Sequence, residues 1–233
     1  MIRFLRFALL PLLFIGSCSA QISSGTDVSA QDPLQRHVSG VQLDDETVLD
    51  GIIAVTRAAG LPLSIEYPLR AKMSDSAPSV KTVTAAIEPD TVQRILDRLC
   101  GLDPEFTWMR NGTVVNVLPR SLADDPLYLL NRRVDEITFN RVSHADDAVV
   151  KMVGQLPGPR EQLAVLQVGV VSDFARPWNA TLKQLTVREV LNAIALRFGS
   201  GWGWELSGAK NFRMITFHQS LSVGPKRLRQ DEP

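Results

Sequence analysis

Apolar residues along the chain follow a helical spacing in some segments and alternate strictly with polar residues in others. The clearest example is residues 186–204. Its first part places apolar residues at every third or fourth position, which predicts a helix, and Thr186 with Glu189 forms the pattern of a capping box. The period then becomes two, with Trp202 and Trp204 on one face of a predicted strand.

The same succession of periods occurs earlier in the chain. Residues 91–96 repeat the apolar spacing of residues 186–191, and an aromatic pair, Phe106 and Trp108, follows. We therefore predict an internal duplication, in which each copy contains strand, helix, strand, strand, helix, strand and strand. Because a helix needs an apolar sheet face to cover it, the predicted fold class is α+β, with two tandem small repeats, each a mixed β-sheet packed against two helices.

Composition changes along the chain suggest its boundaries. The segment before residue 37 is rich in Ser, Gln, Asp and Ala, which is typical of a disordered tether. The apolar residues 127–130 are expected to pack between the repeats. The predicted organisation is a signal peptide over 1–20, a disordered tether over 21–36, a first repeat over 37–120, a connector over 121–133, a second repeat over 134–219 and a disordered tail over 220–233.

The N-terminus follows the three-part plan of a secretory signal peptide. Arg3 and Arg6 precede an apolar run over 7–15, and small residues follow. Two processing sites compete: cleavage at a sequence resembling a lipobox would leave Cys18 as the lipid-attachment residue, and cleavage after Ala20 would discard it. We expect an exported, periplasmic protein, which is an outer-membrane-anchored lipoprotein if Cys18 is acylated.

Charge and metal-ligand spacing argue against several classes of function. The 25 Lys and Arg residues balance 25 Asp and Glu residues, unlike the basic surface of a nucleic-acid binder. His37, His144 and His218 are scattered and no cysteine pair occurs, so neither a metal nor a cofactor is predicted. Cys100 follows Leu99 on a predicted helix and is interpreted as a small buried side chain.

Two short motifs have the residue types of active sites but not their context. Residues 143–147 bring a hydroxyl, an imidazole and carboxylates together immediately before a helix, where caps and helix-dipole partners are expected, as at residues 44–46. Gly199, Gly201 and Gly203 follow a helix and enter a strand, the reverse of the order in a phosphate-binding loop. No catalytic residue is predicted, and the chain is expected not to be an enzyme.

Residues 82–118 resemble the secretin and TonB N-terminus short domain, with a strand, a helix of (T)(V/L)xxxLdxLL spacing, an aromatic strand and a hairpin. Residues 48–67 resemble the preceding helix and strand of such a domain, and the second repeat resembles the same module with a longer final hairpin. The resemblance implies periplasmic domains that bind other proteins or pack against each other in secretion channels, without catalytic residues. No pore domain or outer-membrane barrel follows the repeats in this sequence, so the channel or transporter role is not carried over.

The leading interpretation is a non-enzymatic protein-binding or assembly module of the bacterial cell envelope. Its partner would be another envelope protein, and neither nucleic acid nor a small-molecule substrate is implied. The alternative is a cell-wall or glycan-binding protein, since tryptophan faces can stack on sugar rings. Aromatic residues at the same place in both copies more often fill a core. The tryptophans concerned are Trp108, Trp178, Trp202 and Trp204.

The partner is predicted to bind at an exposed strand edge. An exposed strand edge is a template for a partner strand, and the strands that close the two repeats, at residues 113–118 and 214–217, are the predicted edges. The alternative is that these two edges face each other across the connector and are internal. If strand addition is ruled out, the polar helix face at Arg188, Asn192 and Arg197 is the next candidate surface.

Overall fold

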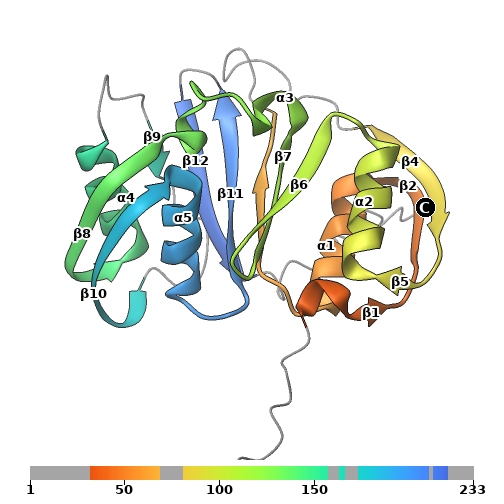
Figure 1. The fold of residues 1–233 in the computed structure, drawn as a ribbon, viewed down its shortest axis with the longest axis horizontal. Coiled ribbons are helices and arrows are strands. Elements are labelled where there is room, and N and C mark those ends of the chain that lie inside the picture. Colours follow the sequence, from red (N-terminus) through yellow and green to blue (C-terminus); the bar gives the residue numbers. More distant parts are fainter. Residues whose placement is uncertain (1–31, 69–80, 157–162, 166–172, 210–211, 220–233) are drawn as a thin grey trace, which may run out of the picture. The chain divides into compact units, whose positions relative to one another are not determined.

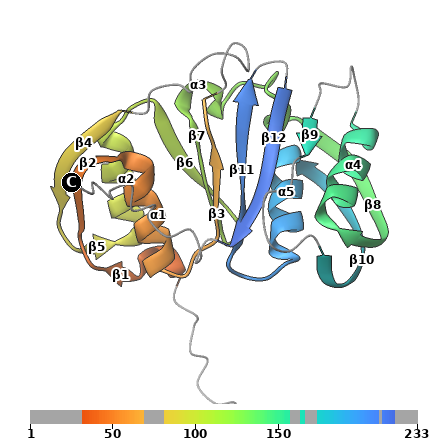
Figure 2. The ribbon, with the colours of Figure 1, turned by 180° about the vertical axis from the view of Figure 1, so that it is seen from behind.

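The computed structural model describes residues 32–68, 81–156, 163–165, 173–209 and 212–219, and its α-helices and strands are labelled in Figures 1 and 2. Its helices are η1 (Pro33–Gln35), α1 (Val48–Ala58), α2 (Val92–Leu102), α3 (Arg120–Ala123), η2 (Leu129–Asn131), α4 (Ala145–Gln155) and α5 (Val187–Leu196), where η marks a 3-10 helix. Its strands are β1 (His37–Val38), β2 (Val41–Thr47), β3 (Leu63–Glu66), β4 (Thr82–Ile87), β5 (Asp90–Thr91), β6 (Phe106–Asn111), β7 (Val114–Pro119), β8 (Arg133–His144), β9 (Leu163–Val165), β10 (Asp173–Thr186), β11 (Trp202–Ala209) and β12 (Phe212–Gln219).

The predicted α+β class is confirmed, since helices and mixed sheets occur together throughout the described chain. We call residues 32–119 the first half and residues 133–219 the second half. The predicted signal peptide, Cys18, most of the predicted tether and the predicted tail lie outside the described residues.

Three of the helices begin at a threonine that caps the main chain. The Thr47 hydroxyl accepts a hydrogen bond from the Asp50 amide, and the Asp50 carboxylate accepts one from the Thr47 amide. Thr91 caps α2 through its side chain, and Thr186 forms the same reciprocal box with Glu189 before α5. These contacts satisfy amides that have no partner inside a helix, so the helix starts are encoded locally, and the capping box predicted at Thr186 is confirmed.

One mixed sheet contains strands from both halves, in the order β6-β7-β3-β11-β12-β9. Within the first half β6 and β7 form an antiparallel hairpin and β3 lies parallel to β7. Within the second half β11 and β12 form the hairpin and β9 lies parallel to β12. This arrangement corrects the prediction of a separate mixed sheet for each repeat, because β3 also pairs in parallel with β11 and joins the halves. A common origin of the two halves stays a prediction.

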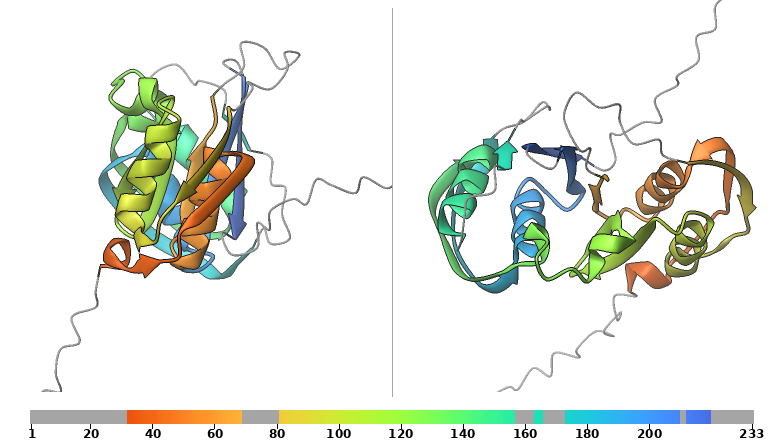
Figure 3. Two further views of the ribbon diagram at one scale, coloured as in Figure 1. Left: turned by 90° about the vertical axis from the view of Figure 1, so that its right-hand side faces the viewer. Right: turned by 90° about the horizontal axis from the view of Figure 1, so that it is seen from above.

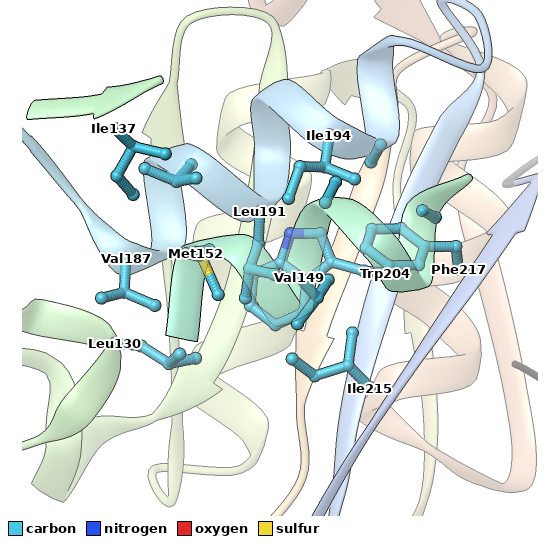
Figure 4. Close-up of a cluster of buried hydrophobic side chains, with 14 of the residues drawn as sticks. Leu130, Ile137, Val149, Met152, Val187, Leu191, Ile194, Trp204, Ile215 and Phe217 are labelled. Atoms are coloured by element: carbon cyan, nitrogen blue, oxygen red, sulfur yellow. The ribbon is translucent and has the colours of Figure 1, made fainter. Parts of the chain in front are cut away.

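Antiparallel strand pairs also lie outside this sheet, namely β2 with β4 and the short pair β1 with β5 in the first half, and β8 with β10 in the second. The core of the first half includes Leu43 of β2, Ile52 of α1 and Ile65 of β3. The core of the second half likewise joins the outer strand pair, the helices and the mixed sheet, and Figure 4 shows Ile137, Val149, Trp204 and their neighbours. In each half, therefore, one apolar core connects all three layers.

The two cores lie on opposite faces of the mixed sheet. Ile65 of β3 pairs with Glu205 of β11, so these two side chains are on the same face. Ile65 belongs to the first core, whereas Trp204 and Leu206, which flank Glu205, belong to the second. Helices α1 and α2 consequently cover one face and α4 and α5 the other, as the right panel of Figure 3 shows. The face of β3 turned away from its own core therefore meets α5 of the other half.

Two predicted boundaries differ from the structure. The last residues of the predicted tether belong to the fold, because Leu34 of η1 is buried in the first core. The connector packs as predicted at Tyr128, Leu129 and Leu130, which are buried, but Leu127 is 76% exposed. Apolar residues at both boundaries therefore contribute to the folded core.

We predict that Gly203→Ala weakens the joint between the halves. A Cβ at Gly203 would overlap the main-chain carbonyl of Leu63 in β3, and such overpacking costs about 1–3 kcal/mol or forces the strands apart. Gly101→Ala is the control, because a Cβ there meets open space on α2, where alanine stabilises a helix by about 0.5–1 kcal/mol. Chemical unfolding measures both changes, and equal stability of the two variants would contradict the close approach of β3 and β11.

Candidate functional site

The two acidic segments that occupy similar places in the sequence, residues 44–46 and residues 146–147, belong to different kinds of element in the structure. Asp146 and Asp147 lie in the first turn of α4, where their negative charges interact favourably with the positive end of the helix dipole. His144 is the residue before this helix, and its side chain makes no capping hydrogen bond. Residues 44–46 instead belong to strand β2, and Thr47 with Asp50 caps the helix. The dipole interpretation is correct for the second half, and the capping role given to residues 44–46 is wrong.

Titratable residues do not gather into a metal site in the described part of the chain, where no group of three or more His, Cys, Asp or Glu side chains could hold an ion. Cys100 is buried on α2, and burial raises the pKa of its thiol to about 11, so the side chain is a protonated apolar group at neutral pH. His218 lies 3.7 Å from Glu205, and burial lowers the pKa of this histidine to about 4, which keeps it neutral at physiological pH.

The four tryptophans pack within the fold. Trp178 stacks on Phe139 with ring centroids 4.4 Å apart, and Trp202 stacks on Phe198 at 4.7 Å. Trp204 is fully buried in the second core. Trp108 packs partly buried against the first core. Their rings therefore contribute to packing, although Trp108, Trp178 and Trp202 are only partly buried, and glycan binding stays a prediction.

A buried ion pair joins the two halves where β3 meets α5. The Arg188 guanidinium binds both carboxylate oxygens of Glu66, with 3.2 Å between Nη2 and Oε2, and the two side chains are 3% and 1% exposed. Arg188 also donates to the Asn131 side-chain oxygen at 2.7 Å. Asn131 in turn donates to three main-chain carbonyls of the connector. One arginine thus holds both the first half and the connector against α5.

Burial acts on the pKa of the Glu66 carboxyl more strongly than its partners do. Removal from water raises this pKa, while Arg188 and the Tyr128 hydroxyl, which donates to Glu66, act in the opposite direction. Burial and the neighbouring Glu66 carboxylate also raise the pKa of Tyr128. With its oxygens occupied by Arg188 and Tyr128 and its surface covered, Glu66 is placed to hold structure together rather than to exchange protons with a substrate.

A second polar contact crosses the same joint. The Asn192 side-chain oxygen on α5 accepts hydrogen bonds from the Trp204 indole at 2.7 Å and from the Ser64 hydroxyl of β3 at 3.3 Å. Asn192 and Arg188 are both buried, so the prediction of an exposed polar helix face at these residues is wrong. Their spacing correctly placed them away from the core of their own half, but β3 covers that face. No signal in the sequence points to this contact, because Ser64 and Glu66 alternate with Leu63 and Ile65 as they would on a strand with one face in water.

The predicted strand edges are interior strands. β7 pairs with β6 on one side and with β3 on the other, and β12 lies between β11 and β9. The prediction of outer edges at residues 113–118 and 214–217 is therefore wrong, because a parallel strand from earlier in the chain covers each one. Among the described strands of the mixed sheet, β6 and β9 occupy the two ends.

The main chain of β6 alternates between its partner and the outer side. The Glu105 carbonyl accepts a hydrogen bond from the Arg120 amide at 2.7 Å, which continues the pairing with β7. Alternation in an antiparallel pair then directs the main-chain groups of Phe106, Trp108 and Arg110 away from β7. The Arg120 guanidinium binds the Phe106 carbonyl at 3.0 Å. Among the described residues, the part of this edge whose outward main-chain groups have no hydrogen-bonding partner lies around Trp108 and Arg110.

We predict that Arg188→Met destabilises the protein by about 3–5 kcal/mol, because Glu66 remains buried without its counter-charge. Arg188 lowers the pKa of Glu66, so its loss should raise this pKa further above the ordinary glutamate value of 4.5 than burial alone does in the native protein. A group with a raised pKa in the folded state loses stability as the pH rises, so the variant should lose stability over a wider range of pH than the native protein, and its deficit should be largest at high pH, where Glu66 is ionised in both.

Unfolding in denaturant across a pH series measures this loss. Lys183→Met is the matched control, because it removes one partner of an exposed ion pair with Glu136 and should cost at most about 1 kcal/mol. A loss of the same size in both variants at neutral pH would show that the buried pair does not join the halves.

The helices in the described part of the chain include none that is long and apolar enough to cross a membrane. Comparison of the chain with known protein families, with curated proteins and with solved structures gave no match.

Proposed function

We propose that this chain is an exported, non-enzymatic protein-binding or assembly module of the bacterial cell envelope, and that it binds its partner by adding a strand to the β6 edge. The observation that supports this function most directly is the pairing of β3 with β11. β11 is the first strand of the hairpin in the second half, as β6 is in the first half. One such strand already accepts a parallel strand, and the other has its outer side available.

The two strands have the same relation to their helices. The Trp108 indole of β6 donates to Asp97 of α2 at 2.9 Å, and the Trp204 indole of β11 donates to Asn192 of α5 at 2.7 Å. Asp97 and Asn192 each follow the capping threonine of their helix by six positions. β6 and β11 therefore occupy equivalent places, which supports the same binding mode at both.

Main-chain pairing suits a protein without a reactive cluster in its described residues. At the internal joint, the Tyr67 amide donates to the Leu206 carbonyl of β11 at 2.9 Å. Such bonds supply affinity without requiring particular side chains. The proposed partner is therefore another envelope protein that presents an extended segment, with its direction parallel to β6.

We predict that Arg110→Pro abolishes binding of the partner and that Arg110→Ala does not. Proline removes an outward-facing amide of β6 and is tolerated on an edge strand, whereas alanine keeps the amide and removes only the side chain that pairs with Asp32. Proteins captured from envelope extracts by the alanine variant but not by the proline variant would be strand-adding partners. Amide exchange at Trp108 and at residue 110 of the alanine variant should then slow when such a partner is added, and unchanged exchange at both positions would contradict strand addition.

We predict that the mature protein lacks its first 17 or 20 residues, because Arg3 and Arg6 with the following apolar run form an export signal. The intact mass of the protein purified from envelope fractions distinguishes an acylated chain that begins at Cys18 from an unmodified chain that begins at Gln21. A cytosolic product that keeps Met1 would contradict export.

A further inference from the structure

The two halves are joined through unlike edges. In the first half the outer strand at the joint is β3, and in the second half it is β11, the first strand of the hairpin. A contact between two different surfaces of similar units is heterologous, and it leaves one surface of each kind unpaired. In the described part of the mixed sheet these are β6, which corresponds to β11, and β9, which corresponds to β3. The β9 edge of a second copy could therefore meet β6 as β3 meets β11.

The β6 edge lacks the side chains that favour the internal joint. Gln93 of α2 and Arg188 of α5 each follow the capping threonine of their helix by two positions, so α2 lacks the arginine that pairs with Glu66 at the internal joint. Because the Trp108 and Trp204 indoles make equivalent contacts, Thr107, which precedes Trp108, corresponds to Gly203, which precedes Trp204. Gly203 is the position at which a Cβ would overlap the Leu63 carbonyl, so Thr107 opposes an equally close approach.

A second obstacle at β6 is Arg120, which follows β7. Its guanidinium donates through Nε to the Pro104 carbonyl at 2.9 Å and through Nη2 to the Phe106 carbonyl at 3.0 Å. The Phe106 carbonyl faces the outer side of β6, where an added strand would place its own amide. An arginine that occupies edge carbonyls, like other charged groups on edge strands, discourages unwanted pairing. Arg120 therefore competes with any strand that adds at this end of β6.

We propose that Arg120 and Thr107 prevent a second copy of this chain from adding its β9 to β6, and so stop the head-to-tail pairing after two halves. This inference rests on the proposed function in one respect, namely that β6 can accept a parallel strand. A natural partner would bind at Trp108 and Arg110, beyond the carbonyls that Arg120 covers. Removal of both obstacles should open the full length of β6 to a second copy.

Sedimentation equilibrium of the purified chain tests the proposal, with Cys18→Ser in every variant. The chain with the native β6 edge should be monomeric. Arg120→Ala should strengthen self-association of the chain at least about tenfold, and the double variant Thr107→Gly with Arg120→Ala should strengthen it further. Arg110→Ala is the control and should stay monomeric, because the Arg110 side chain binds Asp32 and the Gly112 carbonyl rather than an outward carbonyl of β6. Monomers for all variants, or self-association of the native edge, would overturn the proposal.

Cross-linking then tests the direction of the contact in the Arg120→Ala background. The register of the internal joint, transferred to the outer edges, places Thr107 of one copy opposite Val165 of the other. A Thr107→Cys chain mixed with a Val165→Cys chain should form a disulfide-linked dimer, and neither chain should do so alone. Homodimers of one variant would overturn the head-to-tail arrangement. Loss of partner capture by Arg110→Pro is a separate result, so the proposed function and this inference can fail independently.

Discussion

The arrangement of the described chain depends on the buried contact between Glu66 of β3 and Arg188 of α5. Two charges removed from water are costly unless each finds its partner in good geometry, and here both carboxylate oxygens face the guanidinium. Apolar contacts tolerate small shifts between layers, whereas this pair is satisfied in one relative placement of β3 and α5. We infer that it specifies how the halves meet, while the two apolar cores supply most of the stability. The connector follows from it, because Asn131 joins Arg188 to the main chain of that segment.

This ion pair is a consequence of cores on opposite faces of one sheet. Each half buries one face of its three strands under its own helices, so the other face has to be covered from elsewhere. On β3 that face carries Ser64 and Glu66, and α5 of the other half supplies Asn192 and Arg188 to meet them. On β3, therefore, the polar side chains face the other half, and the apolar side chains of Leu63 and Ile65 face the core of their own half.

The sequence was informative where structure is determined by neighbours along the chain. Threonine caps, helical spacing and strand alternation act within a few residues, and they placed α2 and α5 close to where the structure has them. Arg188 and Asn192 were misjudged because a residue on the polar face of a helix looks the same in sequence whether water or another half covers it. Glu66 and Arg188 are 122 positions apart. The edges were misjudged for the same reason, since the parallel partner of β7 comes about 50 positions earlier in the chain.

The covalent link between the halves explains how β11 can pair with β3 while the equivalent strand β6, where Thr107 and Arg120 oppose pairing, does not bind a second copy. A tethered strand meets its edge at an effective concentration in the millimolar range, so moderate main-chain pairing is enough to close the internal joint. A second copy has no tether and has to overcome the loss of translational and rotational freedom. Removing a few favourable contacts at β6 is therefore sufficient to separate the two cases. Gly203, Arg188 and Asn192 strengthen the tethered pairing, whereas Thr107 and Arg120 act only against the untethered one. A partner that brings its own side-chain contacts can still use the main chain of β6, which makes the guarded edge selective rather than closed.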